Sequence, residues 1–417
     1  MQRGTEVIIV RKRVVITGGA VVSALGNEWL DILKSLRAGK NCVRYMKDWE
    51  KYTGMNTMLA APIDFTPPGY PRKKIRSLGK VAQLALVSAE KALADAGINP
   101  DDPQLKNGRA GVAYGSSMGS IEPLLDFYSM LVLGDVKKIS ATTYIKAMPQ
   151  TCAANIGVFF GITGRIITAN TACTSSSQAI GFAYETIARG AQDIMLAGGA
   201  EEMSPANAAV FDTLFAASCK NDTPEKTPAA YDKNRDGLVV GEGSGTLILE
   251  EYEYAKKRGA NIIAEIAGFG TNADGSHITQ PNRYTMGIAM KLALEDSRLD
   301  PASIGYVNTH GTATETGDVA ESWATADIFQ RPVPASTLKS YLGHTLGACG
   351  TIEAWLSIKM MKEKWFCPNL NLDELDPRCG PLDYITGNGR EIDTEYIMSN
   401  NFAFGGINSS LIFRNMQ

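Results

Sequence analysis

One segment, Arg165–Gly190, has the sequence RIITANTACTSSSQAIGFAYETIARG and indicates the fold. Its β-branched start favours a strand, its Ser- and Thr-rich centre favours a turn, and the Ala-rich remainder ending at Gly190 favours a helix. This arrangement places Cys173 at the helix N-terminus, where unpaired N–H groups and the helix dipole stabilise a thiolate and lower the thiol pKa. Cys173 is therefore a candidate nucleophile. The alternative is a small buried side chain, and this segment by itself does not separate the two.

The same alternation of strand and helix patterns extends over the whole chain. Short apolar runs such as RVVITGG and GTLILEEY alternate with Ala- and Leu-rich segments, which is typical of an α/β fold. Residues Val81–Ala96 are predicted to form a helix that stops at Gly97. The pattern restarts after Ala260, so we expect two units, residues 1–260 and 261–417. Each has a Gly- and Ser-rich turn after an apolar strand, TANTACTSSS and NNFAFGGINSS, which indicates a structural duplication.

Composition excludes several classes of protein. The chain has 417 residues, of which 44% are hydrophobic and 20% charged, and its formal net charge of −3 argues against a nucleic-acid-binding protein. No apolar run approaches the roughly 20 residues that span a bilayer, and the N-terminal residues do not have the order of a signal peptide. Seven widely spaced cysteines without a C-x-x-C pair argue against a zinc site or a disulfide framework. We therefore expect a soluble cytoplasmic protein.

Two histidine segments strengthen the assignment of Cys173. The segment YVNTHGTATETGD places His310 just after a strand-like run, and KSYLGHTLGACG places Lys339 and His344 in a Gly-rich turn ahead of a helix. Active-site groups of α/β folds gather at such switches between strand and helix. A single histidine is more often a buried core residue, but two such turns together with a nucleophile-type cysteine favour a Cys-His-His site.

The combined motifs resemble those of the β-ketoacyl-acyl-carrier-protein synthases, and the elongating type II enzymes most closely. The resemblance covers nearly the whole chain and rests on the ordered motifs TACTSS, DKNRDGLVVGEGSG, NTHGTATETGD, KSYLGHTLGACG and NNFAFGGIN. It implies a thiolase fold, in which two related βαβαβαββ halves form a five-layered α-β-α-β-α sandwich. It also implies a homodimer, and a heterodimer with a second synthase-like subunit stays open.

The resemblance further implies a decarboxylative Claisen condensation. Cys173 accepts an acyl chain from acyl carrier protein, with the backbone N–H groups of Cys173 and Phe404 stabilising the oxyanion. Malonyl-carrier then loses carbon dioxide, and His310 and His344 donate hydrogen bonds to the enolate oxygen through neutral imidazoles. The remaining implied residues give electrostatic and structural support: Lys339, the Glu321 carboxylate that is expected to hold it, and Asp318.

Other positions are expected to bind the substrate or the carrier. Thr279, Thr312 and Thr314 match positions that hydrogen-bond the pantetheine arm. Met118 and Phe211 match positions that line the acyl pocket, although plain core packing is the alternative for Met118. A basic cluster is a candidate docking patch for an acidic carrier protein, although charge runs are usually solvated surface: Arg72, Lys73, Lys74 and Arg76.

The chain also departs from the family pattern. The C-terminal motif N-S-F-G-F-G-G-T-N is changed by Asn401, Ala403 and Ile407. If position 403 needs a positive φ when this loop swings, the Cβ of Ala403 costs about 1 to 2 kcal/mol. Together with Met118, these changes suggest a specialised synthase, such as one that makes aryl polyenes or other unsaturated chains. The preferred acyl length and the pathway stay open.

The sequence leaves three alternatives to an elongating synthase. Other thiolase-fold enzymes use a second Cys, or Cys with His and Asn, whereas here both partner motifs carry His. A chain-length-factor-like partner subunit lacks the nucleophile, which argues against it because Cys173 is present. A pure carrier-binding module would release no carbon dioxide. We expect neither a cofactor nor a metal, because DKNRDGLVVGEG has Gly243 where a calcium loop needs Glu and no helix follows GFGTNA.

Overall fold

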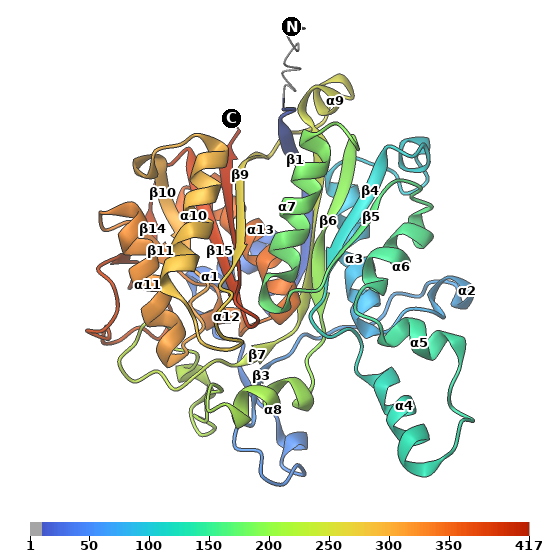
Figure 1. The fold of residues 1–417 in the computed structure, drawn as a ribbon, viewed down its shortest axis with the longest axis horizontal. Helices are drawn as coiled ribbons and strands as arrows, with labels where there is room; N and C mark the ends of the chain where they lie inside the picture. Colours follow the sequence, from blue (N-terminus) through green and yellow to red (C-terminus); the bar gives the residue numbers. More distant parts are fainter. Residues whose placement is uncertain (1–10, 417) are drawn as a thin grey trace, which may run out of the picture.

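A single sheet of eleven strands runs through the computed structural model, which describes residues 11–416 (Figure 1). Outward from its centre, one half of the sheet contains β1 (Val14–Val22), β8 (Gly243–Glu251), β6 (Ile194–Glu201), β4 (Ala110–Gly115) and β5 (Ile166–Ala169). The other half contains β9 (Ala264–Ala273), β16 (Ile407–Asn415), β15 (Tyr396–Ala403), β10 (Ile304–Asn308), β11 (Pro334–Ser336) and β13 (Asp383–Tyr384).

The two halves of the sheet repeat one topology. In each half, the first strand in the chain pairs antiparallel with the last, and the last pairs antiparallel with the one before it. The outer pairs β4–β6 and β4–β5 are parallel, and so are β10–β15 and β10–β11. An antiparallel contact between β1 and β9 joins the halves. This repetition of order and direction is the structural duplication that the two Gly- and Ser-rich turns indicated.

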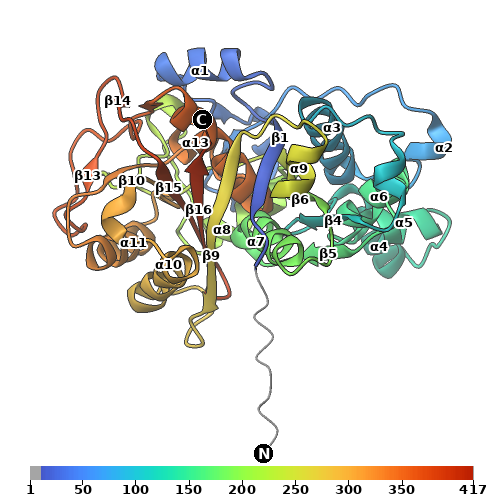
Figure 2. The same ribbon diagram turned by 90° about the horizontal axis from the view of Figure 1, so that it is seen from above.

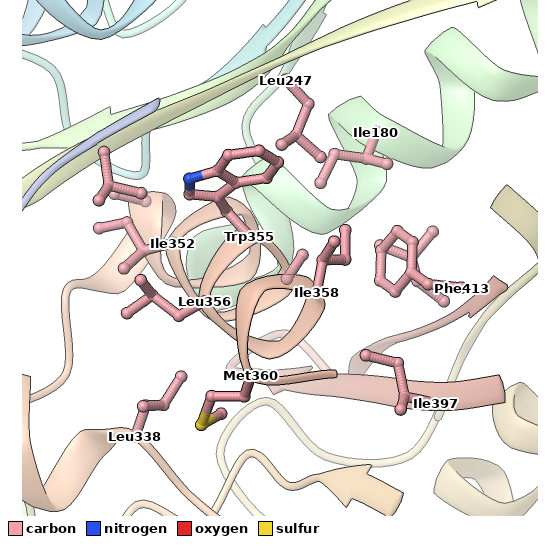
Figure 3. Close-up of a cluster of buried hydrophobic side chains, with 14 of the residues drawn as sticks. Ile180, Leu247, Leu338, Ile352, Trp355, Leu356, Ile358, Met360, Ile397 and Phe413 are labelled. Atoms are coloured by element: carbon pink, nitrogen blue, oxygen red, sulfur yellow. The ribbon is translucent and has the colours of Figure 1, made fainter. Parts of the chain in front are cut away.

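Two buried helices, α7 (Ser175–Ala188) and α13 (Cys349–Lys362), lie between the halves. Every residue of α13 from Cys349 to Met361 except Lys359 is buried, as expected for a helix with no solvent-facing side. Figure 3 shows Trp355 of α13 pointing toward Ile180 and Leu247. Phe413, which belongs to β16 in the other half of the sheet, is part of the same buried cluster. Gly19 gives the indole room, because a Cβ there would lie 2.6 Å from the Trp355 ring.

The outer faces of the sheet are covered by two helix pairs (Figure 2). One pair is α3 (Lys80–Asp95) and α6 (Thr151–Phe160), and its apolar residues form a core with β1, β4, β6 and β8. The other pair is α10 (Arg283–Ser297) and α11 (Glu315–Phe329), which pack against β10, β15 and β16. The predicted α-β-α-β-α order is therefore confirmed. Helix α3 also confirms the predicted helix, and Gly97 adopts φ +67° just beyond it.

The remaining elements are short and lie around these layers. The helices are α1 (Trp29–Arg37), α2 (Arg72–Ile75), α4 (Glu122–Leu133), α5 (Ala141–Ala147), α8 (Pro205–Thr213), α9 (Tyr252–Lys257) and α12 (Lys339–Leu342). The strands β2 (Arg44–Tyr45), β3 (Leu59–Ala61) and β7 (Val240–Gly241) form one small sheet, and β12 (Trp365–Phe366) pairs with β14 (Arg390–Glu391). Figure 1 shows α4 and α5 projecting from the body of the protein.

Two expectations about the chain as a whole can be checked on this structure. All seven cysteines are free, which agrees with the expected lack of a disulfide framework. Among residues 11–416, no helix combines the length and the apolar character needed to cross a membrane.

Candidate active site

Cys173 lies in a short 3₁₀ turn, Ala172–Thr174, between β5 and the first residue of α7. Hydroxyl side chains close this turn: Ser175 Oγ accepts from the Thr171 N–H at 3.0 Å, and Thr174 Oγ1 donates to the Thr171 carbonyl at 2.7 Å. Ala172 has φ 49°, which turns the chain sharply just before the cysteine. The predicted position of Cys173 at the start of a helix is confirmed.

Cys173 opens into a cavity that residues from both halves of the chain line. His310 follows β10, and His344 lies in the loop between α12 and α13. Nine of the predicted site residues line this cavity. They are the nucleophile, the two histidines, the three threonines, two phenylalanines and one glutamate: Cys173, His310, His344, Thr279, Thr312, Thr314, Phe211, Phe404 and Glu321.

The two imidazoles lie edge to face, with ring centroids 5.1 Å apart. Nε2 of His344 lies 3.0 Å from Sγ of Cys173, and Nδ1 of His344 accepts the Leu346 N–H at 3.3 Å. Because Nδ1 is an acceptor, the neutral ring carries its proton on Nε2 and directs it at the sulfur. Burial, and then the positive charge of Lys339, hold the pKa of both His310 and His344 well below the ordinary value.

The sequence-based expectation of a lowered thiol pKa for Cys173 is wrong. Burial raises the pKa of Cys173 to about 11, although Lys339 and the N–H groups of Phe404 and Cys173 act in the opposite direction. The helix N-terminus is present, but Cys173 is only 6% exposed, and burial disfavours the charged form.

A second correction concerns the carboxylate that holds Lys339, which is Glu353 and not Glu321. Nζ of Lys339 lies 2.5 Å from Oε1 of Glu353, and both side chains are at most 3% exposed. Burial is the largest single influence and lowers the pKa of Lys339. The charge and hydrogen bond of Glu353, together with Cys349 and Glu321, outweigh burial, and the pKa is raised. Sequence analysis missed Glu353, although an acid inside an otherwise apolar helix was a visible signal.

Glu321 and Asp318 instead hold the loop that carries His310. The carboxylate of Glu321 accepts the backbone N–H groups of His310 and Gly311 at 2.6 and 2.7 Å. Asp318 accepts the N–H groups of Tyr231 and Ala313 at 2.7 and 3.1 Å. Burial raises the pKa of Glu321 to about 7 and that of Asp318 to about 6. These contacts support a structural contribution from both acids.

The acyl-pocket candidates surround a smaller hollow that Cys173 also lines. Met118 and Phe211 line it together with Phe404, and the rings of Phe211 and Phe404 have centroids 5.4 Å apart. Sequence analysis missed Glu201, a fully buried acid whose carboxylate accepts the N–H groups of Ser117 and Gly347 at 2.7 and 2.9 Å. Two adjacent acids, Glu201 and Glu202, at the end of the apolar run IMLAGGA were the available signal.

The loop after β15 shows no strain at the substituted position. Ala403 ends β15 with a negative φ, and the positive values fall on Gly405 at 88° and Gly406 at 68°. The basic candidates Arg72, Lys73, Lys74 and Arg76 are exposed in and beside α2, and none of them lines the cavity.

The site has potential metal ligands. Ligand atoms of Cys173, His310 and His344 lie within 4.8 Å of one another, and His310, Cys349 and Glu353 form a second such group. Zinc binds cysteine and histidine, but the histidine nitrogen must then offer a lone pair. His344 offers Nε2–H instead, because its Nδ1 is the acceptor. The first group therefore does not fit zinc in this tautomer.

Comparison with known proteins identifies the family of this chain. Two family models match the chain: "Beta-ketoacyl synthase, N-terminal domain" at residues 11–255 and "Beta-ketoacyl synthase, C-terminal domain" at residues 263–373. The chain belongs to the β-ketoacyl synthase family. A 3-oxoacyl-[acyl-carrier-protein] synthase 2 from Vibrio harveyi is 36% identical over 97% of the chain and 99% of the relative. A synthase 1 from Escherichia coli is 37% identical over 97% of the chain and the whole relative.

Solved structures give the same result for this β-ketoacyl synthase. A β-ketoacyl synthase from Burkholderia phymatum has a TM-score of 0.96 and 57% identity, covering 97% of this chain and 100% of that one. The ishigamide ketosynthase/chain length factor has a TM-score of 0.88 and 29% identity over 98% and 100%. AntDE:AntF, a type II acyl-carrier protein in complex with its ketosynthase, has a TM-score of 0.87 and 28% identity over 98% and 100%.

Proposed function

We propose that this β-ketoacyl synthase condenses an acyl chain, taken from acyl carrier protein onto Cys173, with malonyl-acyl carrier protein to give 3-oxoacyl-acyl carrier protein. The supporting observation is that one cavity holds the thiol and both imidazoles, with Cys173 Sγ 3.0 Å from His344 Nε2. The relatives named as 3-oxoacyl-acyl-carrier-protein synthases match over nearly their whole length, which supports the same reaction here.

In the first half-reaction the sulfur of Cys173 attacks the carbonyl carbon of the acyl thioester. The N–H groups of Cys173 and Phe404 stabilise the oxyanion, and removing one such donor typically costs about 2.7 to 4 kcal/mol of barrier. The carbon–sulfur bond to the carrier then breaks. The proton lost from Cys173 goes to the departing pantetheine thiolate, which leaves as a thiol. Since the pKa of Cys173 is about 11, the reactive thiolate is a minor species at neutral pH.

In the second half-reaction malonyl-carrier loses carbon dioxide, and the electron pair of the broken bond forms an enolate. His310 and His344 donate N–H groups to its oxygen, which neutral imidazoles can do. Lys339 favours the neutral rings, because its charge lowers the pKa of both. The enolate carbon attacks the acyl-Cys173 carbonyl, and the Cys173 sulfur leaves as a thiolate, which regenerates the enzyme on protonation.

The pantetheine arm would reach Cys173 along a row of threonines. Thr279, Thr312 and Thr314 all line the cavity, and the hydroxyls of Thr312 and Thr314 lie 2.9 Å apart. Hydroxyls can donate to the carbonyls and accept from the amides of this arm. Met118 and Phe211 would contact the acyl chain in the smaller hollow that Cys173 also lines.

The partners are proposals on the same basis. The exposed cations Arg72, Lys73, Lys74 and Arg76 would attract an acidic carrier protein. The AntDE:AntF complex shows that a related ketosynthase binds an acyl-carrier protein.

We further propose a homodimer formed at β5, an edge strand whose Ile166 is 41% exposed. A chain length factor, as in the ishigamide pair, is the alternative second subunit. Light scattering coupled to gel filtration measures the molar mass in solution. It would therefore distinguish a homodimer from a monomer that needs a different second subunit.

Acyl transfer is the decisive test of this function. Wild-type protein incubated with acyl-carrier should gain the acyl mass on Cys173, and Cys173→Ala should not; malonyl-carrier should release carbon dioxide. An unmodified wild type would support the partner-subunit alternative, and an absence of carbon dioxide would support a carrier-binding module. Comparing rates on saturated and polyene acyl-carriers tests the proposed specialisation, which a flat preference for saturated chains contradicts. The cytoplasmic location and the division at residue 260 stay predictions.

A further inference from the structure

Asn401 occupies a position between the ion pair and one of the two imidazoles. It lies on β15 and is 1% exposed. Its Nδ2 atom is 2.9 Å from Oε2 of Glu353 and 3.4 Å from Nδ1 of His310. Asn401 therefore connects the Lys339–Glu353 pair with the ring that lines the cavity.

The orientation of the Asn401 amide follows from the charge beside it. Oε1 of Glu353 faces the ammonium of Lys339 at 2.5 Å, so the carboxylate is ionised and its Oε2 only accepts hydrogen bonds. The Asn401 atom facing Oε2 must then be the amide nitrogen. Oδ1 points the other way, and no partner for it is found among residues 11–416.

This orientation decides which nitrogen of His310 carries the proton. Nδ2 of Asn401 has two hydrogens, and Glu353 accepts one of them. Nδ1 of His310 at 3.4 Å and Sγ of Cys349 at 3.5 Å both lie within reach of the other hydrogen. The sulfur is the weaker acceptor and donates its own hydrogen to the Cys173 carbonyl, so the second Asn401 hydrogen goes to Nδ1 of His310. Nδ1 is then the acceptor, and the neutral ring carries its proton on Nε2. His344 reaches the same tautomer through the backbone N–H of Leu346. The backbone therefore sets the tautomer of His344, whereas the tautomer of His310 depends on a side chain, that of Asn401.

We propose that Asn401 is a positioning residue that holds His310 in the Nε2–H tautomer by donating to Nδ1. Its own orientation is set by the Lys339–Glu353 pair. The inference rests on the proposed function, because an Nε2–H donor is useful where an enolate oxygen forms. Acyl transfer to Cys173 uses the N–H groups of Cys173 and Phe404 instead. Asn401 therefore serves decarboxylation and not the first half-reaction.

The two half-reactions give a readout that a merely structural residue would not separate. For Asn401→Ala we expect kcat for carbon dioxide release from malonyl-carrier to fall about 10- to 100-fold, less than the loss on removing a transition-state donor outright. The rate of acyl-Cys173 formation should stay within about threefold. Asn401→Ser differs from Asn401→Ala by one hydroxyl that can donate a hydrogen bond. Its kcat for carbon dioxide release should therefore fall less than that of Asn401→Ala. Equal losses in both half-reactions, or no loss in either, would overturn the proposal.

Asn400→Ala is the matched control. Asn400 is the neighbouring residue on β15 and is fully buried, but its side chain points to the opposite face of the strand and makes no hydrogen bond within the described residues. This variant should keep the wild-type ratio of the two rates. A selective loss of carbon dioxide release in Asn400→Ala would show that any truncation of β15 has the effect, and would remove the case for Asn401.

Nitrogen NMR of the wild type tests the tautomer without any variant at Asn401. The chain has only three histidines, so ¹⁵N-histidine labelling gives three ring systems, and His277→Gln identifies the exposed one. We expect the Nδ1 shift of His310 to be that of an unprotonated nitrogen. A protonated Nδ1 would refute the inference even if the enzyme condenses, whereas a wild type that releases no carbon dioxide refutes the proposed function and leaves the tautomer result standing.

Discussion

Replacing Lys339 with Met tests how much the buried ion pair contributes to stability. Both partners are at most 3% exposed, and their charged atoms are 2.5 Å apart. Coulomb's law with an effective dielectric constant of about 20 gives roughly 6 to 7 kcal/mol of attraction at that separation. Burying each ion costs several kcal/mol, so the net contribution of the intact pair is small. Lys339→Met removes the attraction but leaves the Glu353 carboxylate buried, which typically costs about 3 to 5 kcal/mol.

Urea-induced unfolding followed by circular dichroism measures this cost. We expect Lys339→Met and Glu353→Gln each to lower the free energy of unfolding by about 3 kcal/mol or more. The double variant Lys339→Met/Glu353→Gln leaves no uncompensated charge, so it should be more stable than either single variant. If each single variant loses less than about 1 kcal/mol, or the double variant loses the sum of both, the pair is not coupled as the structure indicates.

Four further outcomes are expected. The pKa of about 11 for Cys173 predicts that its alkylation by iodoacetamide accelerates about tenfold per pH unit between pH 7 and 9, and a plateau in that range would contradict it. The lowered pKa values of His310 and His344 keep both rings neutral well below pH 6.5. Lys339→Met removes one cause of this lowering, so the pKa of both rings should rise. The fall of carbon dioxide release on the acid side of the pH profile should then begin at higher pH. Gly347→Ala places a Cβ 2.5 Å from the N atom of Ser117 and should cost about 1 to 3 kcal/mol in urea unfolding, whereas Gly69→Ala meets nothing within 4 Å and should be neutral. Charge reversal at Arg72 together with Lys73 should raise KM for acyl-carrier several-fold at unchanged kcat, and an unchanged KM would place the carrier elsewhere.

The fold and the nucleophile were predictable because their signals are local. The segment around Cys173 carries its own strand, turn and helix signals, and the structure has β5, the 3₁₀ turn and α7 in that order. The alternation of apolar runs with Ala-rich segments indicated the α/β class. The grouping of Cys173, His310 and His344 followed from motifs at three places in the chain, since each lies at a switch where a strand or turn precedes a helix.

The environment of those groups depends on what packs around them, which the order of residues does not show. Glu321 and Glu353 are both buried acids near the site, and only the position of α13 beside α12 decides which one meets Lys339. Asn401 was visible only as a departure from a motif. Its contact with His310 arises because β15 pairs with β10, and its contact with Glu353 arises because β15 lies beside α13. The raised pKa of the Cys173 thiol also depends on the packing around it. A helix N-terminus is a local feature and was predicted correctly, whereas desolvation sums over every neighbouring atom from both halves of the protein, and that sum exists only after they have packed together.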